Sequence, residues 1–206
     1  KLPPQTRHST VHAPVGLVVM GISTGGPAAL LELFKAMGKV TAPIVVAQHM
    51  PAEFTKGFAQ HLQRETGLTV MEGENGLELQ PHMIVIAPGG TDTMVRERLP
   101  GKLSLVTQLS ANRPIHPSAD ALFESAAMLK MPTLGVVLTG MGNDGTHGGQ
   151  ALARRGMPLL AQEPSTCTVD GMPGSLIRAG LATDILTLPQ LALRLQHWAG
   201  HRADKP

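Results

Sequence analysis

Three short segments contain the residue types of nucleophilic catalysis, and each directly follows an apolar run. The first, residues 21–26, reads GISTGG and matches G-x-S-x-G, in which glycines permit a sharp strand-to-helix turn that leaves Ser23 Oγ uncovered. Free N–H groups at the start of the following helix would face an oxyanion formed there. A phosphate-binding loop or a structural turn is an equally open alternative from this segment alone, although neither G-x-G-x-x-G nor a P-loop is present.

The second segment, residues 48–51, reads QHMP and contains His49. A single histidine is more often structural than catalytic. However, in a doubly wound sheet the loops that follow neighbouring parallel strands reach the same crevice. His49 comes about one β-α-β crossover after Ser23, so the two side chains are expected to meet at adjacent strand ends.

The third segment, residues 139–145, reads TGMGNDG, and Asp144 is its only charge. An aspartate at this place could simply cap the next helix. Beside His49, its carboxylate would instead accept the ring N–H, fix the tautomer and stabilise the imidazolium that forms as Ser23 loses its proton. Together the three segments predict a serine hydrolase.

Regular elements that could position these loops alternate along the chain. Continuous apolar runs, typical of strands buried on both faces of a parallel sheet, occupy 16–20, 44–47, 83–87, 133–138 and 158–161. Helical patterns occupy 27–37, 53–65, 118–130, 148–155 and 189–198. Residues 94–98 and 103–108 flank the turn sequence LPGK and indicate a hairpin. We therefore predict an α/β fold with a doubly wound, mostly parallel, Rossmann-like sheet flanked by helices and an antiparallel β-hairpin at one edge.

Composition limits the possible partners. Of the 206 residues only 2% are aromatic and the net charge is +2, which argues against nucleic-acid binding. The single Cys167 cannot form an internal disulfide or a thiolate zinc site. The longest apolar stretch, 15–22, is interrupted by two glycines and is too short to span a bilayer. We expect a cytoplasmic protein without membrane insertion.

The chain divides into one large domain and two short ends. Residues 1–14 are rich in proline and polar side chains and are predicted to form a linker or disordered arm. Residues 15–200 would be the catalytic domain and 201–206 a tail. The arm lacks the apolar region of a signal peptide, and its first residue is Lys, which suggests a fragment or a processed product.

Several motifs, in order, resemble one known family. They are GISTGGP at 21–27, QHMP at 48–51, APG at 87–89, PSADALF at 117–123, LTGMGNDG at 138–145, AQE at 161–163 and GMP at 171–173. These strings are similar to the catalytic domain of the CheB family, the bacterial chemotaxis protein-glutamate methylesterases. The resemblance extends from about residue 15 to the last helix.

The resemblance implies a role for each candidate residue. Ser23 would be the nucleophile, His49 the general base and Asp144 its orienting carboxylate. Backbone N–H groups near Thr24 and Met141 would be candidates for the oxyanion site. The implied reaction, through an acyl-enzyme, hydrolyses glutamate γ-methyl esters on cytoplasmic helices of methylated chemoreceptors, releases methanol and needs no metal or organic cofactor. Deamidation of certain receptor glutamines is implied as a second activity.

The family also implies partners and exposes departures. Its members commonly carry an N-terminal receiver domain, so a receiver domain in cis or a histidine kinase pathway is an expected partner. Asp92 lies in the loop where the family usually has a His, and His116 replaces the Arg of Arg-Pro-Ser-Val-Asp. The exchange of Arg for His loses a permanent charge and a bidentate donor. If these positions contact the receptor or brace the site, target choice or efficiency would differ.

Two alternatives to an esterase stay open: a catalytically weak receptor-binding domain and a phosphate- or nucleotide-binding module of the same fold. Three other residues receive simpler interpretations. Asp120 is expected to be structural, at the start of a helix. His147 is a weak candidate metal ligand that lacks a third partner in the sequence. Cys167 is expected to be a buried, inert thiol.

Overall fold

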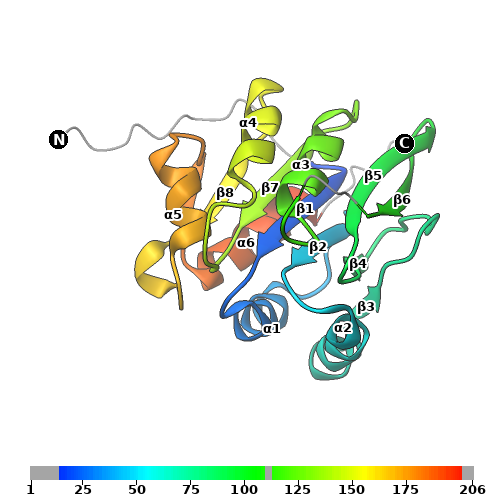
Figure 1. Ribbon diagram of the computed structural model, residues 1–206, viewed down its shortest axis with the longest axis horizontal. Coiled ribbons are helices and arrows are strands. Elements are labelled where there is room, and N and C mark those ends of the chain that lie inside the picture. Colours follow the sequence, from blue (N-terminus) through cyan, green and yellow to red (C-terminus); the bar gives the residue numbers. More distant parts are fainter. Residues whose placement is uncertain (1–13, 110–112, 201–206) are drawn as a thin grey trace.

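The computed structural model describes residues 14–109 and 113–200, and its centre is a parallel sheet with helices on both faces (Figure 1). The seven strands lie in the order β3-β4-β2-β1-β7-β8-β9, and every neighbouring pair is parallel. Their bounds are β1 Leu17–Ile22, β2 Ile44–Gln48, β3 Thr69–Glu72, β4 Met83–Ile86, β7 Thr133–Val137, β8 Leu159–Gln162 and β9 Asp184–Leu186. This confirms the predicted fold class. The predicted arm, except Pro14, and the predicted tail lie outside the described residues.

The helices form two layers. The helix bounds are α1 Gly26–Met37, α2 Ala52–Thr66, α3 Ala119–Ala127, α4 Thr146–Arg154, α5 Gly171–Arg178 and α6 Leu188–Ala199, with a short 3₁₀ turn at Pro164–Thr166. Helices α1, α2 and α6 pack against one face of the sheet, and α3, α4 and α5 pack against the other. Within the described ranges, no helix combines the length and apolar character needed to cross a membrane.

Strand β1 shows why the sheet needs cover on both faces. All six of its residues are buried, and successive side chains enter opposite cores. Val18 and Met20 belong to the core beneath α1, α2 and α6, whereas Leu17 and Val19 belong to the core beneath α3, α4 and α5. The continuous apolar run that predicted this strand is therefore explained by burial on two sides.

The predicted hairpin is present as β5 (Asp92–Leu99) and β6 (Lys102–Gln108), paired antiparallel. It forms a two-stranded sheet of its own and does not extend the seven-stranded sheet. Its buried side packs on the α3 layer, where the N–H of Val95 donates to Ser125 Oγ at 3.0 Å. The hairpin therefore connects directly to α3, a helix that contributes to the site.

Strands β3 and β9, helix α5 and the 3₁₀ turn were not predicted from the sequence. Strands β3 and β9 are the two edges of the sheet, only four and three residues long and partly exposed, so they lack a continuous apolar run. Helix α5 has the sequence GMPGSLIR, whose glycines and proline disfavour a helix in isolation. Its Met172 and Leu176 are fully buried, and this packing stabilises the helix despite its composition.

Candidate active site

The three candidate side chains follow three neighbouring central strands, at the carboxyl ends of those strands. From β1 the chain continues to β2 on one side and later to β7 on the other, which makes β1 the place where the strand order reverses. Crevices at such reversals, outside the carboxyl ends of the strands, are the usual ligand sites of open α/β sheets. Ser23 follows β1, His49 follows β2 and Asp144 lies in the loop after β7.

His49 lies beside Ser23 because the register of β1 and β2 puts it there. Ile22 and Gln48, the last residues of the two strands, are direct partners. Ser23 and His49 are therefore the next residues after two adjacent strands. Neighbouring strands are about 4.8 Å apart. The N–H of His49 also donates to the carbonyl of Ile22 at 3.0 Å, which keeps the two strand ends together.

His49 and Asp144 are in contact. The distance from His49 Nε2 to Asp144 Oδ2 is 2.7 Å, and the side chains are 10% and 13% exposed. Because a carboxylate only accepts hydrogen bonds, Nε2 carries the hydrogen and Nδ1 is the ring nitrogen left to exchange protons. This orientation is the reverse of the usual triad, in which Nε2 faces the serine.

Ser23 has a fixed backbone and a free hydroxyl. Its N–H donates to the carbonyl of Thr139 at 3.0 Å, and its carbonyl accepts from the N–H of Gly26 at 2.8 Å and from Gln48 Nε2 at 3.1 Å. Among the described residues, Ser23 Oγ makes no hydrogen bond. Three hydrogen bonds thus hold the main chain at Ser23, and Oγ stays available.

The carboxylate of Asp144 lies at the N-terminus of α3. It accepts hydrogen bonds from Ser118 Oγ at 3.0 Å and from the backbone N–H groups of Ala119 at 2.7 Å and Asp120 at 2.8 Å. Burial raises the pKa of Asp144, but hydrogen bonds from His49 and from these N–H groups outweigh it and hold the pKa below the ordinary value. Asp144 is therefore ionised next to the imidazole.

Asp120 stabilises the loop that carries Asp144. Its Oδ1 accepts from the N–H groups of Gly145 at 2.9 Å and Gly148 at 2.7 Å, at the start of α4. Burial raises the pKa of Asp120, and the negative charge of Asp144 raises it further. The expectation of a structural role for Asp120 agrees with these contacts.

Gln48 is a site residue that sequence reasoning missed. Its side chain is 2% exposed, and Nε2 donates both to the carbonyl of Ser23 at 3.1 Å and to that of His49 at 3.0 Å. One amide group thus links the main chains of the candidate nucleophile and base. The available signal was a polar residue at the end of an otherwise apolar strand, immediately before His49.

Glycine allows the loop after β7 to approach Ser23 closely. A Cβ on Gly140 would lie 2.7 Å from Ser23 Cβ and 2.4 Å from Met172 Sδ, closer than side-chain carbons pack. The loop is further tied by Thr139 Oγ1, which donates to the carbonyl of Thr24 at 2.9 Å. This glycine-rich loop therefore lies against Ser23 and Met172 with no room for a larger residue at position 140.

Two backbone N–H groups, that of Thr24 next to Ser23 and that of Met141 next to Gly140, are candidates for an oxyanion site. Neither Thr24 nor Met141 donates its N–H to an acceptor within the described residues. Both residues are exposed, and Met141 is 68% accessible. These are the two positions that the sequence resemblance suggested.

The remaining candidates lie outside this arrangement. His147 Nδ1 is 2.8 Å from Glu124 Oε1, and the described part of the chain contains no cluster of three or more acidic, His or Cys side chains that could hold a metal. Cys167 is half-buried, not buried as expected, because it follows the surface 3₁₀ turn. Burial and the nearby Asp170 raise the pKa of its thiol to about 11, which makes it a poor nucleophile.

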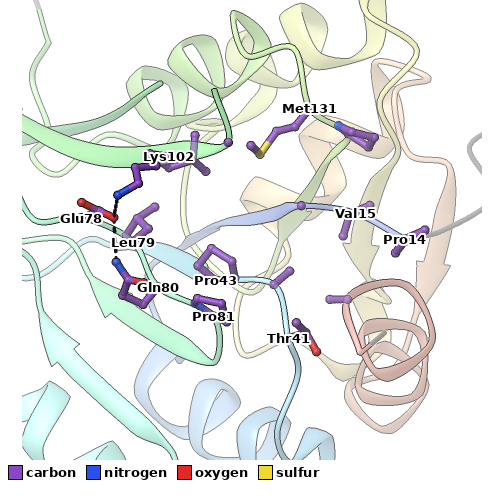
Figure 2. A pocket seen from close by; sticks show the side chains of 16 residues that line it. Pro14, Val15, Thr41, Pro43, Glu78, Leu79, Gln80, Pro81, Lys102 and Met131 are labelled. Atoms are coloured by element: carbon purple, nitrogen blue, oxygen red, sulfur yellow. Dashed lines mark hydrogen bonds and ion pairs between the residues drawn. The ribbon is translucent and has the colours of Figure 1, made fainter. Parts of the chain in front are cut away.

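A cavity of about 440 Å³ lies at the other end of the sheet (Figure 2). It is bordered by residues that precede β1, β2 and β7, including Gly16, Pro43 and Pro132, and by the hairpin turn. Its charged lining pair is Lys102 and Glu78, which lie 3.5 Å apart. None of the candidate catalytic residues borders this cavity, so volume alone does not locate the site.

These features define a doubly wound α/β protein with a histidine–carboxylate pair at the carboxyl edge of its sheet. The family model described as CheB methylesterase matches residues 18–195, and the chain belongs to this family.

Relatives of known name agree with this assignment. A Caulobacter vibrioides protein named protein-glutamate methylesterase/protein-glutamine glutaminase 2 is 44% identical over 86% of this chain and 52% of the relative. A Maricaulis maris protein named protein-glutamate methylesterase/protein-glutamine glutaminase is 40% identical over 92% of this chain and 48% of the relative. The chain spans about half the length of these curated relatives. The Thermotoga maritima CheB methylesterase catalytic domain superposes with a TM-score of 0.83 at 36% identity, covering 89% of this chain and 98% of that one.

Proposed function

We propose that this chain is the catalytic domain of a protein-glutamate methylesterase that hydrolyses γ-methyl esters on chemoreceptor glutamates. The observation that carries the proposal is the 2.7 Å contact between His49 Nε2 and Asp144 Oδ2 at the strand end next to Ser23. A carboxylate at this position would repel a bound phosphate, which disfavours the nucleotide-binding alternative. The family membership and the names of the relatives support the substrate class.

In the first half of the reaction, Ser23 Oγ attacks the ester carbonyl carbon. His49 Nδ1 takes the hydroxyl proton, and the charge of Asp144 stabilises the imidazolium. Negative charge develops on the former carbonyl oxygen, where the N–H groups of Thr24 and Met141 would donate to it. Removing one such donor typically costs about 10²–10³ in turnover.

The bond between the carbonyl carbon and the methoxy oxygen then breaks. His49 gives its proton to the leaving group, which departs as methanol. The glutamyl group is then esterified to Ser23. A water molecule attacks this acyl-enzyme, with His49 again accepting the proton. The bond between the acyl carbon and Ser23 Oγ then breaks, His49 returns its proton to Oγ, and the glutamate carboxylate leaves.

The same sequence of steps serves an amide substrate. With a receptor glutamine, the leaving group is ammonia instead of methanol, and His49 protonates it in the same way. The relatives' names, which include glutaminase, favour this second activity. The two substrates would then compete for one Ser23.

Methanol release tests the proposal. A chemoreceptor cytoplasmic fragment bearing radiolabelled glutamate methyl esters is incubated with the protein, and volatile methanol is counted. Ser23→Ala should lower the release by about 10⁴ or more, since loss of a triad nucleophile removes most of the rate enhancement. Ser165→Ala, at an exposed serine on the 3₁₀ turn, should leave it unchanged. Equal release by wild type and Ser23→Ala would refute the nucleophile assignment.

A further inference from the structure

The two positions at which the sequence departs from the family motifs contact each other beside the site. Asp92, the first residue of β5, is buried, and its Oδ1 lies 2.9 Å from His116 Nδ1. The same Oδ1 accepts the backbone N–H of Ser118 at 3.0 Å. One carboxylate oxygen therefore holds both the side chain of His116 and the main chain of Ser118.

Ser118 is the N-cap residue of α3 and the first of three successive residues that donate to Asp144. Its Oγ accepts from the N–H of Ala121 at 3.3 Å and donates to Asp144 Oδ1 at 3.0 Å. The next two N–H groups along the chain, those of Ala119 and Asp120, donate to the same carboxylate. The position of Ser118 thus sets the position of every α3 group that binds Asp144.

We propose that Asp92 is a positioning residue of the hydrolytic site: it fixes the start of α3 and, through it, the Asp144 carboxylate that orients His49. The inference rests on the proposed function, because it assigns Asp92 a role in the same reaction. Asp92 and His116, the two positions that differ from the family motifs, then act together, because the Asp92 carboxylate binds His116.

The contacts around Asp92 favour this role over simple surface pairing. Hydrogen bonds to an ionised acceptor are shorter and stronger than neutral ones, and burial protects them from water. The second oxygen, Oδ2, faces Arg113 Nε at 3.8 Å and has no hydrogen-bond partner among the described residues. Asp92 is thus oriented by its Oδ1 bonds, one of which is to the backbone at the start of α3.

The hairpin holds Asp92 in a fixed position relative to α3. Asp92 pairs with Gln108 in the hairpin ladder, and three residues further along β5 the N–H of Val95 donates to Ser125 Oγ of α3 at 3.0 Å. The hairpin therefore contacts α3 at two places. Releasing Ser118 would let the first turn of α3 shift while the rest of the helix stays packed, and a shift of about 1 Å near reacting groups can cost about 10²-fold in rate.

Three variants test the inference by steady-state kinetics of ester hydrolysis. Asp92→Ala removes the acceptor and should lower kcat by about 10- to 100-fold with KM within about twofold of wild type. Asp92→Asn keeps an Oδ1 acceptor for Ser118 and His116 and should keep kcat within about fivefold. Asp184→Ala is the matched control, because Asp184 also joins two elements, through Arg194 of α6, but lies at the amino end of β9. Its kcat should equal that of wild type.

The inference is overturned if Asp92→Ala keeps the wild-type kcat, or if Asp92→Asn loses as much activity as Asp92→Ala. Thermal unfolding of each variant shows that the folded protein is being assayed. A structural role alone would lower the unfolding temperature of Asp92→Ala without changing kcat of the folded fraction.

Two further readouts separate this inference from the proposed function. If wild type releases no methanol but a fluorophosphonate labels Ser23, the methylesterase proposal fails, and the labelling rates of the three variants still decide the role of Asp92. If the protein neither releases methanol nor is labelled at Ser23, the role of Asp92 is decided by NMR of the hydrogen-bonded proton on His49 Nε2. We expect this resonance to shift in Asp92→Ala and to stay in place in Asp92→Asn and Asp184→Ala. An unshifted resonance in Asp92→Ala contradicts the inference.

Discussion

Asp144 accepts hydrogen bonds from five groups, whereas the hydroxyl of Ser23 makes none among the described residues. The carboxylate half of the candidate site, consisting of His49, Asp144 and the start of α3, is only slightly exposed, and both oxygens of the Asp144 carboxylate are hydrogen-bonded. The nucleophile half, consisting of Ser23 and the N–H groups of Thr24 and Met141, has a fixed backbone and free polar groups.

The difference follows from what each half must do. The charge that stabilises the imidazolium has to be in place before the reaction, because reorganising it during the reaction would add to the barrier. The serine hydroxyl and the oxyanion donors must stay unpaired, since their partners in the reaction are atoms of the substrate. Substitutions in the two halves should therefore differ in how they affect activity and stability.

Apart from removal of the nucleophile itself, the largest effect is expected in the carboxylate half. Asp144→Asn keeps the size of the side chain but removes the charge and places an amide next to His49 Nε2. An amide N–H there favours the tautomer with the hydrogen on Nδ1, which cannot accept the Ser23 proton. We expect kcat to fall by about 10⁴, measured as ester hydrolysis at neutral pH. A loss of less than tenfold would show that Asp144 does not orient the base.

A smaller loss is expected when the nucleophile is displaced. In Gly140→Ala, the new methyl group would meet Ser23 Cβ and Met172 Sδ, so Ser23 has to move, and kcat should fall by about 10². The matched control is Gly57→Ala in α2, where a methyl group meets nothing within 4 Å. That variant should keep full activity and gain about 0.5–1 kcal/mol in the free energy of unfolding. Equal activity of the two variants would contradict the close approach at Ser23.

Gln48 connects the two halves, and its loss should be milder. Gln48→Leu is close in size but removes the donor shared by the carbonyls of Ser23 and His49. We expect kcat to fall by about tenfold and the free energy of unfolding to fall by about 1–3 kcal/mol, because two buried acceptors lose a partner. Denaturant titration and kinetics on the same sample measure both changes. A stability loss without any change in kcat would limit Gln48 to a folding role.

The smallest and most specific effect concerns pH. The folded-state pKa of Asp144 lies below its ordinary value of 3.8, so the ionised carboxylate favours folding above that value. We expect wild type to exceed Asp144→Asn by about 1–3 kcal/mol in the free energy of unfolding at neutral pH. This advantage should shrink as the pH falls through the lowered pKa, as followed by urea midpoints.

Asp120 provides the control of opposite sign. Burial and Asp144 raise its pKa, so its ionisation opposes folding as the pH rises through the raised pKa. The stability of Asp120→Asn relative to wild type should therefore increase with pH over this range, whereas that of Asp144→Asn decreases. If both variants changed in the same direction, the assignment of the two shifts would be wrong.

Much of this arrangement could be predicted from the sequence. The apolar runs located the central strands, and the residues after them, Ser23 and His49, were expected at adjacent strand ends, where the register of β1 and β2 puts them. The edge strands β3 and β9 were missed because short, half-exposed segments carry little apolar signal.

The polar supports of the site were harder to predict. Gln48, Ser118 and Asp92 act through hydrogen bonds to groups distant in sequence, and no local pattern encodes such partners. Asp92 and His116 are 24 residues apart in the sequence. Only the folded chain brings them together, since β5 and the segment before α3 are joined through space.

Labelling of Ser23 tests the central claim most directly: that residues from three strand ends form one hydrolytic site. A fluorophosphonate reacts with a serine only when a neighbouring base activates it. Peptide mass spectrometry should find the label on Ser23, and His49→Ala should slow the labelling by about 10³ or more. Label on another residue, or an equal rate in wild type and His49→Ala, would contradict the account.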